Sequence, residues 1–377
     1  MHQIACALVA AEVRRLRGGD LPLPPPWADG TAIADEGLGL DSLERLAAMG
    51  ALAEAFELDD AMLGDEPPGT VGAWTNWIMH HHGAGGRRLS VKSSGSTGEP
   101  VLCSHAVADL VMEARFMAEQ LPKRRRVVAL VPAHHMYGLI WTALLPDALG
   151  VPVVTPTVGT PLDLTPGDLV VGVPDQWQAL SRLTRRFPAD VIGISSAGPL
   201  DAALATDLLA SGLTRLVDVY GSSETGGIAF RALPATIYDL LPRWHLLPQG
   251  ESDWQLIDAH GARYPLPDHI ERIGERGLRL IGRRDGAVQV GGHNVWPERV
   301  AATLRELDGI ADAAVRLDGN GRLKAFIVPA DGRDAAQLST LIDRAISQRL
   351  SVAERPRRLR FGPTLPRNAM GKLEDWS

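Results

Sequence analysis

Cysteine is scarce in this chain: of 377 residues, only Cys6 and Cys103 are cysteines. They lie far apart and lack metal-ligand spacing, so neither a disulfide scaffold nor a zinc site is expected. Two unpaired cysteines fit a reducing compartment, and we expect a cytoplasmic protein. The N-terminus lacks a basic stretch followed by an apolar core, so no signal peptide is predicted.

Long hydrophobic runs are also missing. The most apolar stretch, residues 127–149, is interrupted by prolines, histidines and an aspartate, so it is not predicted to span a membrane. Positive charge is not in excess: the net charge is −7 and the basic residues are scattered. Neither a nucleic acid nor an anionic membrane is therefore an expected partner. The hydrophobic fraction of 45% is typical of globular proteins, and the length predicts two or three domains.

Two common nucleotide-binding motifs are absent. No Gly-x-x-x-x-Gly-Lys-Ser/Thr pattern occurs, and no Gly-x-Gly-x-x-Gly follows a strand-like run. The chain contains instead Lys92–Pro100, a run of hydroxyl residues and glycines between two apolar steps. Glycine lets backbone N–H groups turn toward a phosphate, and Ser and Thr add hydroxyl donors. This stretch is therefore either an anion-binding loop or a flexible linker.

The first eighty or so residues have a helical pattern. Apolar residues recur at helical spacing from Ile4 to Leu16, and a second helix is expected to begin within the run Gly-Leu-Asp-Ser-Leu-Glu. Its expected apolar face consists of Leu43, Leu46, Met49, Ala53 and Phe56. Asp41 or Ser42 together with Glu44 forms a capping box. The same run resembles the attachment site of acyl carrier proteins, in which Ser42 would carry phosphopantetheine. Both interpretations of Ser42 stay open.

Between residues 127 and 219, short β-branched runs alternate with helical stretches. This alternation predicts an α/β fold with a largely parallel sheet covered on both faces. In such sheets, ligands gather in the loops that follow the carboxyl ends of the strands. The loops in question are 134–138, 195–200 and 220–227. In the last one, Tyr220 could stack on a base and Glu224 could hold a hard cation such as Mg²⁺.

The order of the expected helices and strands changes near residue 285. Strand, helix, strand, hairpin, strand and helix follow one another, which predicts a small α+β domain over 285–377. This segment ends in Lys372, which follows a glycine on a C-terminal tail. By itself, such a lysine is usually a solvated surface residue.

Taken in order, these loops resemble the motifs of the adenylate-forming superfamily of acyl- and aryl-CoA ligases, luciferases and nonribosomal-peptide adenylation domains. The similarity covers residues 90–377. The wording of 220–227 and 287–295 is similar to the short 4-coumarate–CoA ligases associated with photoactive yellow protein. The resemblance implies an α/β fold in three parts: an acyl-carrier-like helical segment over 1–83, a truncated adenylation core over 84–284, and a mobile C-terminal domain over 285–377.

The resemblance also implies a role for each matched residue. The residues implied for ATP binding are Ser93, Ser94, Gly95, Ser96, Thr97, Gly98, Ala197, Gly198, Tyr220, Gly221, Ser222, Ser223, Asp268 and Arg283. Those implied for the acid are His135, Tyr137, Gly198, Gly221, Gly226 and Gly227. Lys372 and His135 would be catalytic, Glu224 would hold Mg²⁺, and Asp285 would be the hinge.

The sequence departs from the family in several places. The part before the phosphate loop is far shorter than usual, and so is the stretch from Glu224 to Asp268. Leu-Pro replaces Thr-Gly before Asp268, Val101 stands where a lysine usually follows the loop proline, and Gln289 replaces the basic residue after the hinge. These departures concern the clamp on the β- and γ-phosphates rather than the adenylation chemistry.

The implied function is that of an ATP-dependent acid–thiol ligase. A carboxylate would attack the α-phosphorus of MgATP and release pyrophosphate, and a thiol would then attack the mixed anhydride and release AMP. The expected acid is aromatic, with 4-coumarate first, and the expected thiol is coenzyme A. Two alternatives stay open: acyl transfer to an acyl carrier protein or to phosphopantetheine on Ser42, and a non-catalytic scaffold of the same fold.

The acid is expected to lie between the His135–Tyr137 loop and the glycines implied for it. Glycines would leave one wall of the slot flat, and the hydroxyl of Tyr137 could meet a substrate phenol. A site that hydrogen-bonds a substrate hydroxyl strongly rejects the analogue that lacks it. Cinnamate is therefore expected to be a poorer substrate than 4-coumarate.

Overall fold

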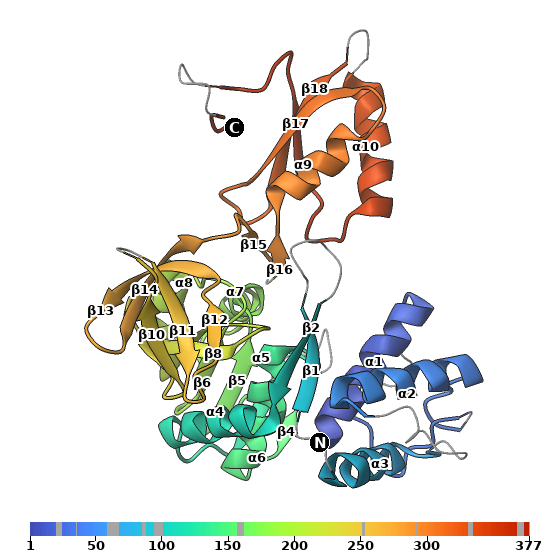
Figure 1. Cartoon of the computed structure of the whole chain (residues 1–377), viewed down its shortest axis with the longest axis vertical. Coiled ribbons are helices and arrows are strands. Elements are labelled where there is room, and N and C mark those ends of the chain that lie inside the picture. Colours follow the sequence, from blue (N-terminus) through green and yellow to red (C-terminus); the bar gives the residue numbers. More distant parts are fainter. Residues whose placement is uncertain are drawn as a thin grey trace. The chain divides into compact units, whose positions relative to one another are not determined.

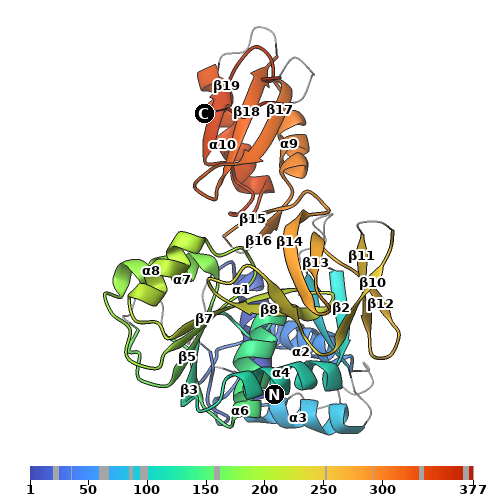
Figure 2. The ribbon, with the colours of Figure 1, turned by 90° about the vertical axis from the view of Figure 1, so that its left-hand side faces the viewer.

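The computed structural model describes residues 1–19, 25–34, 36–58, 68–84, 88–93, 101–156, 162–250, 253–291, 293–330, 335–367 and 373–376. The chain divides into two compact units, Met1–Leu266 with Ile270–Arg279, and Pro267–His269 with Leu280–Ser377. Figures 1 and 2 show the ribbon in two views. The N-terminal helical segment falls in the first unit together with the central sheet, and the three-part division of the chain stays a prediction.

The N-terminal segment is helical, as its apolar spacing predicts (Figure 1). Its helices are α1 His2–Arg17, α2 Ser42–Phe56 and α3 Val71–Ala84. Helix α1 contacts both α2 and α3. Large side chains such as Val13, Phe56 and Trp74 are almost fully buried between them. The three helices therefore share a small apolar core.

Helix α2 begins at a capping box. The Asp41 side chain accepts a hydrogen bond from the Glu44 backbone N–H at 2.8 Å, and the Glu44 carboxylate accepts one from the Asp41 N–H at 3.0 Å. Arg17 donates two further bonds to the Glu44 carboxylate, at 2.5 and 2.7 Å, and these lower the pKa of Glu44. The capping-box interpretation is confirmed. The ion pair of Arg17 with Glu44 also joins the start of α2 to the end of α1. Ser42 is exposed at the first helical position.

The predicted apolar face of α2 is partly wrong. Leu43 and Leu46 are 74% and 65% exposed, whereas Leu52 is fully buried. The buried set of α2 is Glu44, Ala48, Met49, Leu52, Ala53, Ala55 and Phe56. At 3.6 residues per turn this stripe is centred on Leu52, which places Leu43 on the opposite side of the helix. Glu44 can occupy the buried stripe because Arg17 pairs with its carboxylate.

The predicted α/β core is confirmed. A nine-stranded sheet formed by described residues has the order β13-β14-β9-β8-β7-β6-β5-β3-β4. Its strands are β3 Arg126–Ala129, β4 Val153–Val154, β5 Asp168–Gly172, β6 Ile192–Ser195, β7 Arg215–Ser222, β8 Gly226–Ala232, β9 Tyr238–Leu240, β13 Asp268–Ile273 and β14 Gly277–Arg283. Strands β3 to β7 pair in parallel, whereas β8 and β9 are antiparallel to their neighbours.

Helices cover both faces of this sheet (Figure 2). They are α4 Val107–Gln120, α5 Met136–Gly138, the π-helix η2 Leu139–Leu144, α6 Leu145–Leu149, α7 Pro174–Leu183 and α8 Ala202–Ala210. Helices α7 and α8 pack against each other over an apolar cluster that includes Val170, Trp177 and Leu216. Helix α4 packs against η2 and α6. This second group lies beside the loops that carry the candidate site.

Two small antiparallel sheets complete the first unit. One is the hairpin of β1 Arg88–Ser93 and β2 Val101–Ala106, and the other consists of β10 Trp244–Pro248, β11 Trp254–Asp258 and β12 Arg263–Pro265. Strand β1 leads into the predicted phosphate loop, and β2 leads from it into α4. The hairpin therefore connects the predicted phosphate loop to α4, a helix that also contributes residues to the candidate site.

The second unit consists of α+β elements, and the bounds 285–377 expected for a C-terminal domain stay a prediction. Its elements are β15 Val288–Val290, β16 His293–Val295, α9 Pro297–Arg305, β17 Ile310–Leu317, β18 Leu323–Pro329, α10 Ala335–Arg349 and β19 Arg358–Phe361. Strands β17, β18 and β19 form a sheet in that order. Its core includes Val300, Leu304, Ile327 and Ile342. In the described part of the chain, no helix is long and apolar enough to cross a membrane.

Candidate active site

The candidate site is built at the carboxyl ends of two neighbouring parallel strands. In the register of β6 and β7, Ser195, the last residue of β6, pairs with Asp218, and β7 continues to Ser222, so the segment after β6 starts beside the last residues of β7. The Ser196 hydroxyl donates a hydrogen bond to the Val219 carbonyl oxygen at 2.7 Å and joins the two segments. Ala197 has a φ of +65°. A non-glycine residue in this region is uncommon and is often found at functional turns.

The segment 220–227 is a tight hairpin rather than an open loop. Strand β7 continues to Ser222, and Gly221 pairs with Gly227 in β8. A Cβ on Gly221 would lie 2.3 Å from the Gly226 carbonyl oxygen, so only glycine fits there. The buried hydroxyl of Thr225 accepts a hydrogen bond from the Ser222 N–H at 3.3 Å and lies 2.9 Å from the Gly226 carbonyl oxygen. These contacts leave three residues, 223–225, to form the tip.

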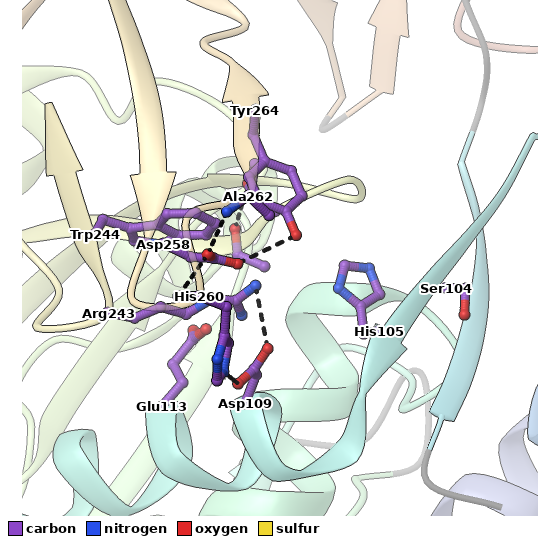
Figure 3. Close-up of polar contacts among 12 residues, drawn as sticks. Ser104, His105, Asp109, Glu113, Arg243, Trp244, Asp258, His260, Ala262 and Tyr264 are labelled. Carbon is purple, nitrogen blue, oxygen red and sulfur yellow. Dashed lines mark hydrogen bonds and ion pairs between the residues drawn. The ribbon is translucent and has the colours of Figure 1, made fainter. Parts of the chain in front are cut away.

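Glu224 is exposed at this tip, and His105 forms a hydrogen bond to the tip at the neighbouring residue, Ser223. The His105 Nε2 donates to the Ser223 carbonyl oxygen at 2.8 Å, since a carbonyl can only accept. Burial lowers the pKa of His105, which favours the neutral ring, and the hydrogen bond to the Ser223 carbonyl oxygen places its proton on Nε2. Glu224 lines a pocket of about 190 Å³ together with His105, Arg88 and Asp109. Figure 3 shows His105 and Asp109 there.

Arg243 also lines this pocket. Its guanidinium lies 3.6 Å from the Asp109 carboxylate and 4.4 Å from the centre of the Trp244 ring, and its side chain is only 9% exposed (Figure 3). Among the described residues, its Nε and Nη1 have no hydrogen-bond partner. The site therefore holds a buried cation that the sequence patterns do not single out.

Glu113 of α4 binds the hairpin at Gly227, the second residue of β8. Its carboxylate accepts from the Gly227 N–H at 3.1 and 3.2 Å, while the Gly227 carbonyl oxygen accepts from Trp244 Nε1 at 2.7 Å. Both backbone groups of Gly227 are thus bound by side chains. Burial raises the pKa of Glu113 to about 7, against the opposing effects of the Gly227 N–H and of Arg243.

The space beside Gly226 and Gly227, where a flat wall of the acid site is predicted, is filled by other side chains. A Cβ on Gly227 would lie 2.2 Å from Glu113 Oε1, and one on Gly226 would lie 3.1 Å from Glu113 Oε2. The next atoms from Gly226 are Ile140 Cδ1 at 3.7 Å and Leu110 Cδ2 at 3.9 Å. The glycines therefore face one carboxyl group and apolar side chains, which sequence reasoning had not placed there.

Tyr137 does not offer a free hydroxyl. Its oxygen lies 3.0 Å from the carbonyl oxygens of both Gly172 and Ile194, at the ends of β5 and β6. A phenol has one proton to donate, and these carbonyls take it. Burial raises the pKa of Tyr137 well above its ordinary value, so the group stays protonated. The hydroxyl therefore could meet a substrate phenol only as an acceptor, and both this contact and the place of the ring in the acid site stay predictions.

The two histidines beside Tyr137 differ in exposure. His135 is exposed at the N-cap of α5, where a catalytic or substrate-binding side chain would be accessible. The His134 ring lies against it, with ring centres 4.1 Å apart and the ring planes tilted by 48°. Burial and the neighbouring His135 lower the pKa of His134 to about 3, so its ring is neutral at physiological pH. The roles assigned to His135 stay predictions.

In the second unit, Asp268, Arg283 and Asp285 lie together. Arg283 donates to both carboxylate oxygens of Asp285, at 2.6 and 3.1 Å, and its guanidinium is 3.8 Å from the buried Asp268 carboxylate. Burial would raise the pKa of Asp285, but the bonds from Arg283 and from the Ala287 N–H prevail and lower it. The fifteen-residue spacing of Asp268 and Arg283 thus corresponds to a real contact.

Some predicted residues lie outside the described part of the chain. They are Ser94, Gly95, Ser96, Thr97, Gly98 and Lys372. Ser93, the last residue of β1, is described and buried. Glu113 is the main residue that sequence reasoning missed. A signal existed, because the buried stripe of α4, formed by Leu110, Ala114 and Met117, also contains this single carboxylate.

Comparisons with known proteins show the family of this chain. A sequence model of the family described as AMP-binding enzyme matches residues 93–269. The chain is 37% identical to the 4-coumarate–CoA ligase of Halorhodospira halophila, over 98% of this chain and 96% of that protein. It is also 37% identical to the 4-coumarate–CoA ligase of Rhodobacter capsulatus, over 100% of both chains. The fold is similar to that of o-succinylbenzoate CoA synthetase from Bacillus subtilis, with a TM-score of 0.61 and 19% identity, over 76% of this chain and 67% of that one.

Replacing Glu113 by Gln should stabilise the protein more strongly at pH 8 than at pH 5. The carboxyl pKa is about 7 in the folded protein against an ordinary 4.5, so between these values only the folded state holds the proton. The unfolding free energy of the wild type therefore falls as pH rises through this window, by roughly 3 kcal/mol in total. Gln keeps an acceptor for the Gly227 N–H and does not titrate. Urea unfolding of both proteins at the two pH values measures the difference; an equal difference at pH 5 and pH 8 would contradict the raised pKa.

Proposed function

The chain belongs to the AMP-binding, adenylate-forming enzymes, and from this premise we propose that it joins an aromatic acid, 4-coumarate first, to coenzyme A at the expense of ATP. The observation that carries the proposal is the β7–β8 hairpin: its tip presents Glu224 and is bound by His105, and its strand β7 is joined to the segment after β6 by the Ser196 hydrogen bond to Val219. Similarity along the whole chain to two 4-coumarate–CoA ligases supports the choice of acid and thiol.

In the first half-reaction, the carboxylate of the acid attacks the α-phosphorus of ATP and pyrophosphate leaves. This step brings anions together, so it needs donors and cations that neutralise charge. We assign the hydroxyl and glycine loop of residues 93–98 to the phosphates. The neighbouring segments 197–198 and 220–223 are assigned to the adenine, and Asp268 with Arg283 to the ribose.

Mg²⁺ fits the carboxylate of Glu224. Magnesium prefers oxygen ligands and is usually held by one or two carboxylates, with water and substrate phosphates completing its shell. Glu224 is exposed at the tip of a rigid hairpin, where an ion arriving with ATP can reach it. The ion would supply positive charge to the phosphates. The protein's own contribution is to fix the backbone next to that carboxylate, through the His105 hydrogen bond to the Ser223 carbonyl oxygen.

In the second half-reaction, a thiol attacks the acyl adenylate and AMP leaves. We assign Lys372 to the first half-reaction, because a lysine on a C-terminal tail can approach the phosphates and withdraw with its domain. Asp285 is assigned as the hinge of that movement. In the structure Asp285 is bound by Arg283 and by the Ala287 N–H, so a hinge motion there would have to break or carry these bonds.

The direct test is ATP–pyrophosphate exchange with a panel of 4-coumarate, cinnamate, benzoate and a medium-chain fatty acid, followed by thioester formation with coenzyme A. We expect the highest kcat/KM for 4-coumarate. Exchange with none of the acids would favour the non-catalytic scaffold. A higher kcat/KM for the fatty acid would reject the aromatic assignment.

The acyl acceptor needs its own test, because Ser42 is exposed at the start of α2. The capping box accounts for Asp41 and Glu44 without any modification. We therefore expect the intact mass to be unchanged after co-expression with a phosphopantetheinyl transferase, and we expect free coenzyme A to serve as acceptor. A mass gain of one phosphopantetheine arm, lost in Ser42→Ala, would transfer the acceptor role to this serine.

Glu224→Gln should raise the Mg²⁺ concentration needed for half-maximal exchange by about tenfold, which corresponds to a loss of about 1.4 kcal/mol of binding free energy. The amide keeps the shape of the side chain but loses the charge that attracts a hard cation. Exchange rates measured over a Mg²⁺ titration test this, and activity should recover at high Mg²⁺. An unchanged Mg²⁺ dependence would place the ion on another residue.

A further inference from the structure

Glu57 joins the N-terminal helical segment to the β1–β2 hairpin. It follows the last residue of α2. Its Oε1 atom accepts a hydrogen bond from the hydroxyl of Ser90 in β1, at 2.8 Å, and another from the hydroxyl of Ser104 in β2. These two serines are paired across the hairpin. One carboxylate oxygen therefore binds both strands at the same level.

Arg88 of β1 completes this polar contact. Its Nε donates to the Ser104 hydroxyl at 2.7 Å and its Nη2 donates to the Ser104 carbonyl oxygen at 2.9 Å. The same Nε lies 3.8 Å from the Glu57 carboxylate. Burial would raise the pKa of Glu57, but the hydrogen bonds from Ser104 and Ser90 and the charge of Arg88 prevail and lower it. The group that binds the hairpin is therefore an ionised carboxylate at neutral pH.

The backbone of Glu57 is in the left-handed region, with a φ of 51° and a ψ of 45°. Glycine is the usual residue at this position after a helix, because a Cβ makes the left-handed conformation costly. The hydrogen bonds of the Glu57 side chain offset part of this cost. Non-glycine residues in this conformation cluster at functional sites, which makes the target of the Glu57 side chain informative.

The β1–β2 hairpin connects this contact to the candidate site. Ser104 and His105 are consecutive in β2, and successive side chains of a strand point to opposite faces (Figure 3). Ser104 binds Glu57, whereas His105 is 4% exposed and donates to the Ser223 carbonyl oxygen beside Glu224. Two neighbouring residues of one strand thus bind α2 on one side and the β7–β8 tip on the other.

We propose that Glu57 is a positioning residue of the adenylation site. By binding both strands of the β1–β2 hairpin, it fixes the place of His105 and thereby of the tip that carries Glu224. The N-terminal helical segment then supports the first half-reaction from outside the site. The proposal rests on the proposed function, because it takes Glu224 to hold the Mg²⁺ that arrives with ATP.

The test measures the two half-reactions separately in the wild type and in Glu57→Gly. Glycine removes the carboxylate and suits the left-handed backbone, so the variant is expected to fold. We expect the MgATP concentration for half-maximal ATP–pyrophosphate exchange with 4-coumarate to rise about tenfold, which corresponds to about 1.4 kcal/mol. Conversion of pre-formed coumaroyl adenylate and coenzyme A to the thioester consumes no MgATP, and its rate should stay within about twofold of the wild type.

Two further changes test the contact itself. Glu57→Gln keeps an oxygen acceptor for both serines, so its MgATP requirement should stay within about threefold of the wild type. Ser90→Ala combined with Ser104→Ala removes the donors and should act like Glu57→Gly. Adding Glu57→Gly to these two changes should have little further effect, because all of them break the same contact. Effects that multiply in full would overturn the proposal.

Lys123→Gly is the matched control. Lys123 also has a left-handed backbone, with a φ of 63°, and it is exposed between α4 and β3 in the same unit. Glycine makes the same backbone change there, outside α2 and the β1–β2 hairpin. The MgATP requirement should therefore stay within about twofold of the wild type. A rise as large as that of Glu57→Gly would show a general effect of the added glycine and would overturn the proposal.

The remaining outcomes separate the inference from the proposed function. If Glu57→Gly slows both half-reactions in equal proportion, Glu57 only stabilises the fold and the inference is overturned. If Glu57→Gly leaves the MgATP requirement unchanged, the inference fails while the ligase function stands. If the wild type catalyses exchange with none of the acids, the proposed function itself fails, and the positioning role of Glu57 fails with it.

Discussion

The geometry of the site depends on how Gly227 is held. Its N–H donates to the Glu113 carboxylate from one side, and its carbonyl accepts from the Trp244 indole on the other. These two contacts join α4, β8 and β10 at a single residue with no side chain of its own. Because Gly227 pairs with Gly221 across the hairpin, the same contacts determine where the tip that carries Glu224 lies. A substitution at Gly227 would therefore disturb the ATP side and the acid side together.

Holding Gly227 with a carboxylate has an energetic consequence. Burying Glu113 with few donors raises its pKa, which means that the ionised form is disfavoured in the folded protein. A fully apolar side chain would avoid this penalty but would leave the Gly227 N–H unsatisfied. The raised pKa therefore accompanies the hydrogen bond that holds the hairpin in place, and the stability of the fold depends on pH through this carboxyl group.

Much of the fold could be predicted because its signals are local. The β-branched runs between residues 127 and 219 have the length of buried strands, and they form the parallel sheet. The capping box at Asp41 and Glu44 depends on residues three apart and forms as expected. The prediction that Leu43 lies on the apolar face of α2 was wrong, because Glu44 lies in the buried stripe instead. Glu44 is stabilised there by an ion pair with Arg17, which is distant in sequence. Apolar spacing alone cannot register a partner on another helix.

The sequence by itself determined the family and the reaction class of this protein, because ordered motifs such as Tyr220–Thr225 and the spacing of Asp268 and Arg283 are readable along the chain. Tertiary structure decided which side chains meet at those motifs. Glu113 reaches Gly227 across 114 residues, and Tyr137 gives its hydroxyl to carbonyl groups 35 and 57 residues away. Neither contact has a local pattern, since both arise only when α4 and α5 pack against the folded sheet. For that reason the chemistry could be inferred from the sequence, whereas the partners of Gly227 and Tyr137 emerged only from the packed structure.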